Sequence, residues 1–220
     1  AYAAWWRVEH PDSFHRIYNG FYLPPPLHRV EARATLALPA DATIIGTIGR
    51  LSPVTQPLVW PEAAIALAAQ RSDAHFVWAG GGPLRKAVRE SFVQAGMAER
   101  LNLPGQVDNV PEWLAAFDLF WQTSASEGLP NALIEAQFAG VPVIAFDVGG
   151  VGETFLEGET GRLIAAGDSD TLVRQSLATL DDADWMAKAW HKAPIQARAR
   201  FSAEQFYAAL AALYSELRKA

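Results

Sequence analysis

The sequence contains no cysteine, which excludes disulfide bonds and thiolate metal sites. It also has no run of about five or more basic residues, and its formal net charge is -6. A nucleic-acid groove depends on clustered lysine and arginine, so we expect no nucleic-acid partner. No apolar run approaches the roughly 18 to 20 residues that a bilayer span requires, so we expect membrane association to be peripheral at most.

Several catalytic signatures are absent as well. The hydrolase motif G-x-S-x-G does not occur, and the five histidines have no metal-ligand spacing with one another. The glycine-rich stretch AGGGPLR, residues 79–85, has Arg85 where a G-x-G-x-x-G dinucleotide fingerprint needs its third glycine. An oxidoreductase with a nicotinamide or flavin cofactor is therefore disfavoured.

Two Asp-x-Asp pairs, Asp168 with Asp170 and Asp182 with Asp184, have the pattern with which one large class of sugar-nucleotide enzymes holds a divalent ion. Both stand directly before helical patterns, where aspartates cap free N–H groups and favour the positive end of the helix dipole. We therefore predict that they are helix caps and that the protein uses no metal ion.

What the sequence does contain is an alternation of short, β-rich apolar runs and amphipathic helical patterns. We expect strands at residues 43–49, 75–80, 100–105, 118–124, 141–146 and 161–166. We expect helices at residues 59–71, 84–95, 110–117, 130–139, 168–179, 183–199 and 203–217. This pattern predicts an α/β protein with a Rossmann-like, three-layer domain of about six parallel strands. Such sheets bind ligands beyond the carboxyl ends of their strands.

Residues 1–29 differ in character from the rest of the chain. Asn19 and Gly20 form a turn signal, and the prolines at 24–26 favour an extended linker. We interpret residues 1–29 as the remnant of an upstream domain together with an interdomain linker.

The most informative stretch is SASEGLPNALIEAQFAGVPVIAFDVGG, residues 124–150, in which seven residues separate Glu127 from Glu135. Glu127 is expected in the loop after a strand, and Pro130 at the first position of the next helix, so that both carboxylates can face one crevice. Alternatively, Glu127 and Ser124 help to cap that helix and Glu135 is a solvated helix residue. The apolar surroundings of Glu135 favour a partner or a ligand.

The chemistry of this edge of the sheet indicates the kind of ligand. A helix start offers unpaired N–H groups and a partial positive charge, which suit a phosphate, whereas carboxylates accept hydrogen bonds from hydroxyls. Arg50 directly follows the first expected strand. A loop arginine is usually a solvated surface charge, but at this edge it favours an anion. Phosphates and hydroxyls together suggest a nucleotide sugar.

The chain resembles the carboxy-terminal, donor-binding domain of GT-B fold retaining glycosyltransferases of family four, especially those of bacterial capsular and exopolysaccharide synthesis. The resemblance covers about residues 17–217. The matching motifs, in the family's order, are IYNG (17–20), GRLSP (49–53), AGGGPLR (79–85), EGLPNALIE (127–135), AGVPVIAFDVGG (139–150) and ETGRLI (159–164). It implies that the fold is one half of a GT-B enzyme. Residues 30–200 would form the nucleotide-sugar-binding domain, and residues 201–220 a helix that packs toward a missing amino-terminal domain.

The resemblance also implies roles for single residues. Arg50 would bind the diphosphate and Glu127 the hydroxyls of the donor sugar, both as catalytic residues, while Glu135 would bind the ribose. The other donor-binding residues implied are Gln106 and Val107 near the base, and Gly128, Leu129, Asn131 and Ala132, whose backbone amides would hold phosphate and sugar. Pro130 has no N–H to give.

One position departs from the family's pattern. Where members usually carry a lysine, five residues after the arginine, this chain has Thr55. We count Thr55 among the donor-binding residues, but the loss of a charge-assisted hydrogen bond weakens binding by about tenfold to a few hundredfold. The alternative function is therefore a catalytically silent nucleotide-sugar-binding module.

The activity that the resemblance implies is metal-independent, retaining transfer of a hexose from a uridine-linked sugar, without a cofactor. The acceptor would be a glycan or a lipid-linked glycan in bacterial surface polysaccharide synthesis, bound through the missing amino-terminal domain. We expect this chain to be inactive alone. The implied location is the cytoplasm, including the inner face of the plasma membrane.

Overall fold

The computed structural model describes residues 15–24, 27–56 and 58–218. These residues fall into two compact units, one of residues 23–197 and a smaller one that joins residues 15–22 to residues 198–218. Most of the predicted linker and motif residues lie within them, whereas residues 1–14 lie outside the described part.

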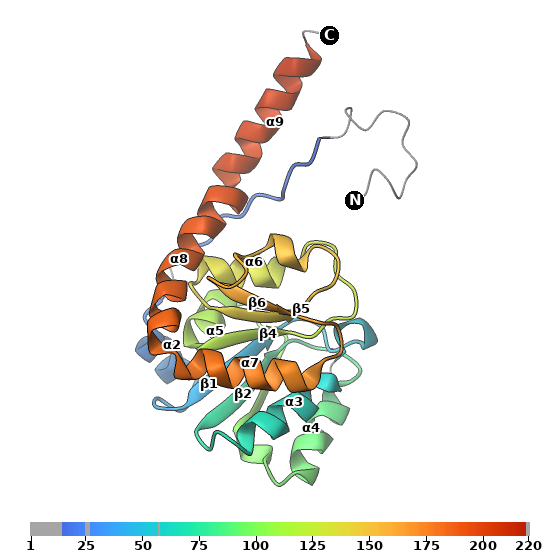
Figure 1. Ribbon diagram of the computed structural model, residues 1–220, viewed down its shortest axis with the longest axis vertical. Helices are drawn as coiled ribbons and strands as arrows, with labels where there is room; N and C mark the ends of the chain where they lie inside the picture. Colours follow the sequence, from blue (N-terminus) through green and yellow to red (C-terminus); the bar gives the residue numbers. More distant parts are fainter. Residues whose placement is uncertain (1–14, 25–26, 57, 219–220) are drawn as a thin grey trace. The chain divides into compact units, whose positions relative to one another are not determined.

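The larger unit is built on a six-stranded parallel sheet with the strand order β3-β2-β1-β4-β5-β6 (Figure 1). The strands are β1 (Thr43–Ile48), β2 (Ala74–Ala79), β3 (Leu101–Gly105), β4 (Leu119–Gln122), β5 (Val143–Phe146) and β6 (Gly161–Ile164). The chain builds the sheet outward from β1 to β3, then returns to the other side of β1 for β4. The predicted Rossmann-like α/β class is confirmed.

Helices cover both faces of the sheet. One face packs against α2 (Arg29–Thr35), α5 (Val110–Ala116) and α6 (Asn131–Phe138), and the other against α3 (Val59–Ala68), α4 (Arg85–Gln94) and α7 (Ser169–Asp181). Because successive strand side chains point to opposite faces, Ile44 belongs to the first core and Ile45 to the second. Burial on both faces explains why the strands read as nearly continuous apolar runs.

The predicted strands and helices are all present, with ends displaced by up to three residues. The helix predicted to start at Pro130 starts at Asn131, since Pro130 is its N-cap and has extended backbone angles, φ -71° and ψ 112°. Helix α2 was not predicted. It has only 7 residues and follows a proline-rich stretch, so its sequence carries little helical signal.

Tertiary contacts hold α2 in place. The buried guanidinium of Arg33 donates to the carbonyl oxygen of Ala116 (3.1 Å) and to Asp118 Oδ2 (2.6 Å). Asp118, just before β4, also accepts hydrogen bonds from Arg29 Nη1 and from the backbone N–H of Ile44, both at 2.7 Å. One carboxylate thus joins α2, β1 and β4 at the amino edge of the sheet.

Three tryptophans form the centre of the core between the sheet and α3, α4 and α7. Trp60, Trp78 and Trp121 are each at most 1% exposed, and the ring of Trp60 meets those of Trp78 and Trp121 edge-on at 5.2 and 6.2 Å between centroids. A buried indole needs an acceptor for its N–H. Trp60 donates to Thr47 Oγ1 (2.9 Å) and Trp78 to the carbonyl oxygen of Gly49 (3.0 Å).

The smaller unit contains the IYNG motif and the junction between α8 (Ala183–Phe201) and α9 (Ala203–Leu217). The backbone N–H of Phe21 donates to the carbonyl oxygen of Phe201 (2.8 Å), and Ala203 N–H donates to the carbonyl oxygen of Phe21 (3.0 Å). A side chain at Gly20 would meet Phe206 Cβ at 2.6 Å, which explains the glycine of the motif. No residue of α9 is buried, and none of the described helices is long and apolar enough to cross a membrane.

We predict that Trp60→Ala lowers the free energy of unfolding by about 3 to 5 kcal/mol, because it leaves a large cavity and removes one of the two hydrogen bonds of the Thr47 hydroxyl. Urea denaturation measures the change. Val93→Ala, on α4 at a side chain that is 56% exposed, is the control and is expected to cost less than about 0.5 kcal/mol. A similarly small loss for both variants would contradict the central role of Trp60.

Candidate functional site

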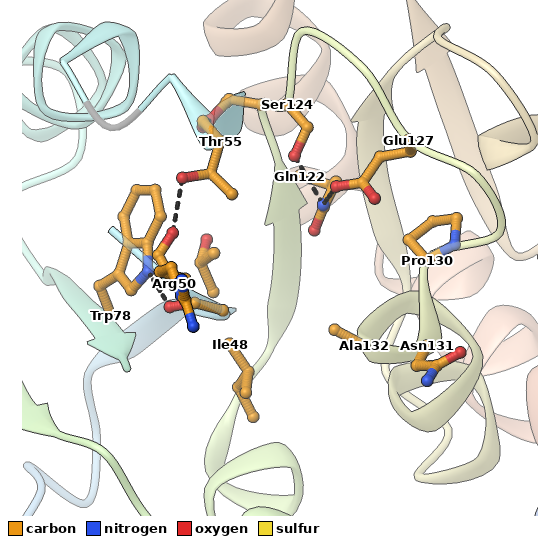
Figure 2. A pocket seen from close by; sticks show the side chains of 13 residues that line it. Ile48, Arg50, Thr55, Trp78, Gln122, Ser124, Glu127, Pro130, Asn131 and Ala132 are labelled. Carbon is orange, nitrogen blue, oxygen red and sulfur yellow. Dashed lines mark hydrogen bonds between the residues drawn. The ribbon is translucent and has the colours of Figure 1, made fainter. Parts of the chain in front are cut away.

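A cavity of about 190 Å³ lies at the carboxyl ends of β1 and β4, where the strand order reverses. This is the position at which open parallel sheets bind their ligands. It is lined by Thr47, Ile48, Gly49, Arg50, Thr55, Trp78, Gln122, Thr123, Ser124, Glu127, Pro130, Asn131 and Ala132 (Figure 2). Of the predicted site residues, the fold therefore brings together Arg50, Thr55, Glu127, Asn131 and Ala132.

The loop after β1 carries Arg50. Its side chain is exposed, lines the cavity and has no hydrogen-bond or ion-pair partner within the described part of the chain. Among the described residues that line the cavity, Arg50 is the only cation and Glu127 the only anion. A free guanidinium at this position can bind an anion without first giving up an internal contact.

Thr55 ends the short 3-10 helix η2 (Pro53–Thr55), which follows Arg50. Its hydroxyl donates to the carbonyl oxygen of Arg50 (2.6 Å) and accepts a hydrogen bond from the backbone N–H of Ser52 (3.2 Å). A hydroxyl has a single proton to donate. Thr55 therefore closes the turn that carries Arg50, and it supplies none of the charge of a lysine.

Hydrogen bonds join this turn to the loops that follow β4 and β2. Thr123 Oγ1 donates to the carbonyl oxygen of Thr55 (3.1 Å), and Ala125 N–H donates to that of Val54 (2.8 Å). On the other side, Leu51 N–H donates to the carbonyl oxygen of Gly81 in the AGGGPLR turn (2.9 Å). The predicted glycine-rich turn thus supports the Arg50 loop.

Glu127 lies half-buried in the loop after β4, with its carboxylate at the cavity. Gln122 Nε2 donates to Glu127 Oε1 (2.6 Å) and to Ser124 Oγ (2.8 Å), as Figure 2 shows. Helix α6 has no side-chain cap. The alternative in which Ser124 and Glu127 cap this helix is therefore wrong.

The loop that leads into α6 presents several free backbone donors. Within the described part of the chain, the N–H groups of Gly128, Leu129, Asn131 and Ala132 donate to no acceptor. Asn131 and Ala132 line the cavity, whereas Gly128 and Leu129 do not. Unpaired amides at the positive end of a helix form a ready anion site.

The glycines of the DVGG segment support the Glu127 loop from behind. Gly149 has a left-handed backbone, φ 54°, and a side chain there would overlap the carbonyl oxygen of Glu127. Gly150 lies equally close to Gly128, and its N–H donates to the Gly128 carbonyl oxygen (2.8 Å). Only glycine permits this close approach of the two loops.

Besides Gly128 and Leu129, three predicted site residues lie outside the cavity lining: Gln106, Val107 and Glu135. Gln106 is exposed and Val107 half-buried in the loop after β3. Glu135 is half-buried, and its carboxyl group makes no hydrogen bond or ion pair within the described part of the chain. Burial raises the pKa of its carboxyl above the ordinary value of 4.5. It follows Asn131 by four residues and so lies on the same side of α6.

Sequence analysis missed Gln122, Ser124 and Trp78 as cavity residues. Trp78 lies in the core and also forms part of the cavity wall. Gln122 had one available signal, since it is the first polar residue after the apolar run LFW of β4. Ser124 carried no comparable signal.

The Asp-x-Asp pairs begin helices as predicted. Asp168 Oδ1 accepts a hydrogen bond from the backbone N–H of Thr171, and Asp182 Oδ1 accepts one from that of Trp185, both at 2.9 Å. The first aspartate of each pair is thus a helix cap.

Comparisons with known proteins agree on a family. Residues 42–182 match the family described as "Glycosyl transferases group 1". The lipopolysaccharide core biosynthesis mannosyltransferase LpsB of Rhizobium meliloti is 33% identical over 200 residues, which are 88% of this chain and 57% of that protein. The Vi polysaccharide biosynthesis protein VipC/TviE of Salmonella typhi is 34% identical over 170 residues, 74% of this chain and 29% of that protein. The chain thus spans little more than half the length of the first relative and less than a third of the second.

Among solved structures, Alr3699/HepE of Anabaena, in complex with UDP and glucose, superposes with a TM-score of 0.81 at 26% identity. The match covers 90% of this chain and 56% of that one. The open six-stranded sheet with its flanking helices therefore matches GT-B glycosyltransferase structures, as predicted.

We predict that Glu135 makes stability depend on pH. Since burial raises the folded-state pKa of Glu135, its stabilising contribution is complete below pH 4.5 and is lost as the pH rises through that raised pKa. Glu135→Gln should therefore gain stability relative to the wild type as the pH rises, measured by urea denaturation from about pH 4 to pH 8. Glu99→Gln, which removes an exposed carboxylate, is the control. Equal pH profiles for the wild type and Glu135→Gln would contradict this assignment.

Proposed function

The chain belongs to the group 1 glycosyl transferases, and on this premise we propose that its cavity binds the nucleotide-sugar donor of a polysaccharide-building transferase. The observation that carries the proposal is the composition of the cavity at the strand-order reversal. There a guanidinium and several helix N-terminal amides, none of which has a partner within the described part of the chain, surround one space together with a carboxylate.

The phosphate groups of the donor would lie between Arg50 and the start of α6. Arg50 offers a planar, permanently charged set of donors, and diphosphate oxygens are its natural partners. Asn131 and Ala132, the first residues of α6, line the cavity, and Gly128 and Leu129 precede them in the chain. Within the described residues, the backbone N–H groups of all four donate to no acceptor. Several neutral N–H donors and the helix dipole would thus supplement one cation.

The sugar and the ribose would each meet a carboxylate. Glu127 has one oxygen bonded to Gln122, and the other accepts no hydrogen bond within the described part of the chain, so it can accept one from a sugar hydroxyl. Glu135 would bind the ribose hydroxyls, which fits its lack of a partner and its place one helical turn beyond Asn131. Gln106 and Val107 would lie beside the base.

We infer a uridine nucleotide as the most direct choice, because the superposed Anabaena protein holds UDP and glucose. During transfer, the bond between sugar and diphosphate breaks and negative charge develops on the leaving group. Arg50 and the α6 amides would stabilise that charge without a metal ion or a cofactor. Departure and attack on the same face of the sugar would retain its configuration.

The acceptor would be a glycan or a lipid-linked glycan, bound by an amino-terminal domain of the whole protein, as the share of the relatives that this chain covers suggests. On this proposal the chain alone binds the donor without transferring the sugar. Synthesis of a bacterial surface polysaccharide, capsule or exopolysaccharide, in the cytoplasm or at the inner face of the plasma membrane, is the setting we propose.

A second candidate rests on Thr55. Thr55 is uncharged, and its hydroxyl donates within its own turn, to the carbonyl oxygen of Arg50 (2.6 Å) or of Ser52 (2.9 Å). The described residues that line the cavity therefore include no second cation. A silent module that binds nucleotide sugars without transfer would show this pattern. The intact turn around Arg50 favours a working site instead, since Thr55 keeps the arginine in place.

We predict that UDP binds the chain and that Arg50→Ala weakens its binding by about tenfold to a hundredfold, because one charge-assisted contact is lost. Isothermal titration calorimetry with UDP and with UDP-glucose measures both. The matched control is Arg174→Ala, which removes an exposed arginine of α7 that does not line the cavity. This variant should bind UDP as tightly as the wild type.

The same titrations in EDTA and in manganese test the metal independence. Equal affinities support it, and binding only with manganese would reject it. If the wild type binds neither UDP nor UDP-glucose, the donor-binding proposal is wrong.

Thr55→Lys separates the two candidates. We expect this variant to bind UDP no more tightly than the wild type, because the new charge replaces the hydrogen bond that closes the Arg50 turn. Thr55→Val loses the same hydrogen bond without adding charge, and we expect it to bind UDP a few-fold more weakly. A gain of about tenfold or more in Thr55→Lys would instead favour a site impaired by loss of the lysine.

A further inference from the structure

Gln122 lies at the carboxyl end of β4, where the rigid sheet gives way to the Glu127 loop. Its backbone is fixed in the sheet, in register with Ala145 of β5, and the three β4 residues before it are fully buried. The side chain is 7% exposed and lines the cavity. A polar residue enclosed this far is stable only with hydrogen-bond partners.

Both protons of the Gln122 amide are in use, one on Glu127 Oε1 (2.6 Å) and one on Ser124 Oγ (2.8 Å). An ionised carboxylate can only accept hydrogen bonds, so Glu127 determines which end of the Gln122 amide faces it. The orientation of the Gln122 amide is thus fixed by the acceptors that it meets, Glu127 and Ser124. A side chain without an N–H group cannot make this pair of hydrogen bonds.

Glu127 depends on this contact for its orientation. The backbone of its loop is held by the hydrogen bond between Gly150 and Gly128, which does not restrain the Glu127 side chain. Within the described part of the chain, Gln122 is the only hydrogen-bond partner of the Glu127 carboxylate. Without this contact, the long side chain of Glu127 samples several rotamers. A ligand contact that requires one of them then costs conformational entropy.

We propose that Gln122 is a positioning residue for the sugar half of the site, holding Glu127 so that its second carboxylate oxygen is ready to accept a hydroxyl of the donor sugar. The inference rests on the proposed function. It predicts that loss of the contact weakens binding of the sugar and not of UDP. The contact orders Glu127, which meets the sugar, and leaves Arg50 and the α6 amides unchanged.

The test compares two ligands on one protein. Gln122→Met keeps the length of the side chain and removes both donors. By calorimetry, its affinity for UDP should equal that of the wild type, while its affinity for UDP-glucose relative to UDP falls by about five- to thirtyfold. If Gln122 had a purely structural role, the substitution would lower the affinity for both ligands equally or for neither.

The matched control is Gln137→Met on α6. Gln137 is also a buried glutamine whose amide donates two hydrogen bonds, to the carbonyl oxygens of Val141 (3.1 Å) and Thr160 (3.2 Å), but it does not line the cavity. The same substitution there should lower stability and leave the ratio of the two affinities unchanged.

If Gln122→Met does not fold, Gln122→Asn takes its place. The amide is retained but withdrawn by roughly 1.5 Å, out of hydrogen-bond reach of Glu127. A folded Gln122 variant with the wild-type ratio of affinities overturns the positioning role while the donor site stands. A wild type that binds neither UDP nor UDP-glucose overturns the proposed function itself.

Discussion

The direct pairing of β1 with β4 is the contact on which the rest of the structure depends. Helices connect β1 to the strands on one side and β4 to those on the other, so the loops that leave these two neighbours diverge and open the cavity between them. At the opposite edge, Asp118 binds β1, β4 and α2 together through the Ile44 N–H and two guanidinium groups. An ionic cluster at the edge opposite the cavity thus reinforces the pairing of β1 with β4.

The site is built largely from backbone atoms and from short-range ties between loops. Val54 and Thr55 bond to the loop after β4, Leu51 bonds to the glycine-rich turn, and Gly150 bonds to Gly128. Few side chains remain to meet a ligand, chiefly Arg50 and Glu127. This division explains why the motifs are rich in glycine and small polar residues, which allow loops to approach each other closely.

Much of this arrangement was predictable from the sequence, for physical reasons. Alternating apolar runs and helical patterns gave the parallel sheet, because burial on both faces leaves a strong signal in every strand. Arg50 and Glu127 could be placed at the carboxyl edge of the sheet because each lies in a loop that follows a predicted strand. Helix α2 was missed because the Arg33 contacts with Ala116 and Asp118 that hold it are distant in sequence. Gln122 and the turn-closing role of Thr55 were missed because a side chain's hydrogen-bond partner is not encoded in local pattern.

The balance of charge in the cavity has a kinetic consequence. Among the described lining residues one guanidinium stands against one carboxylate, in a chain whose formal net charge is -6. One cation matched by one anion gives this lining less positive charge than a strongly basic cleft, which attracts phosphate-bearing ligands from a distance. From these lining charges we expect little long-range steering of such a ligand, and so an association rate that changes little with ionic strength.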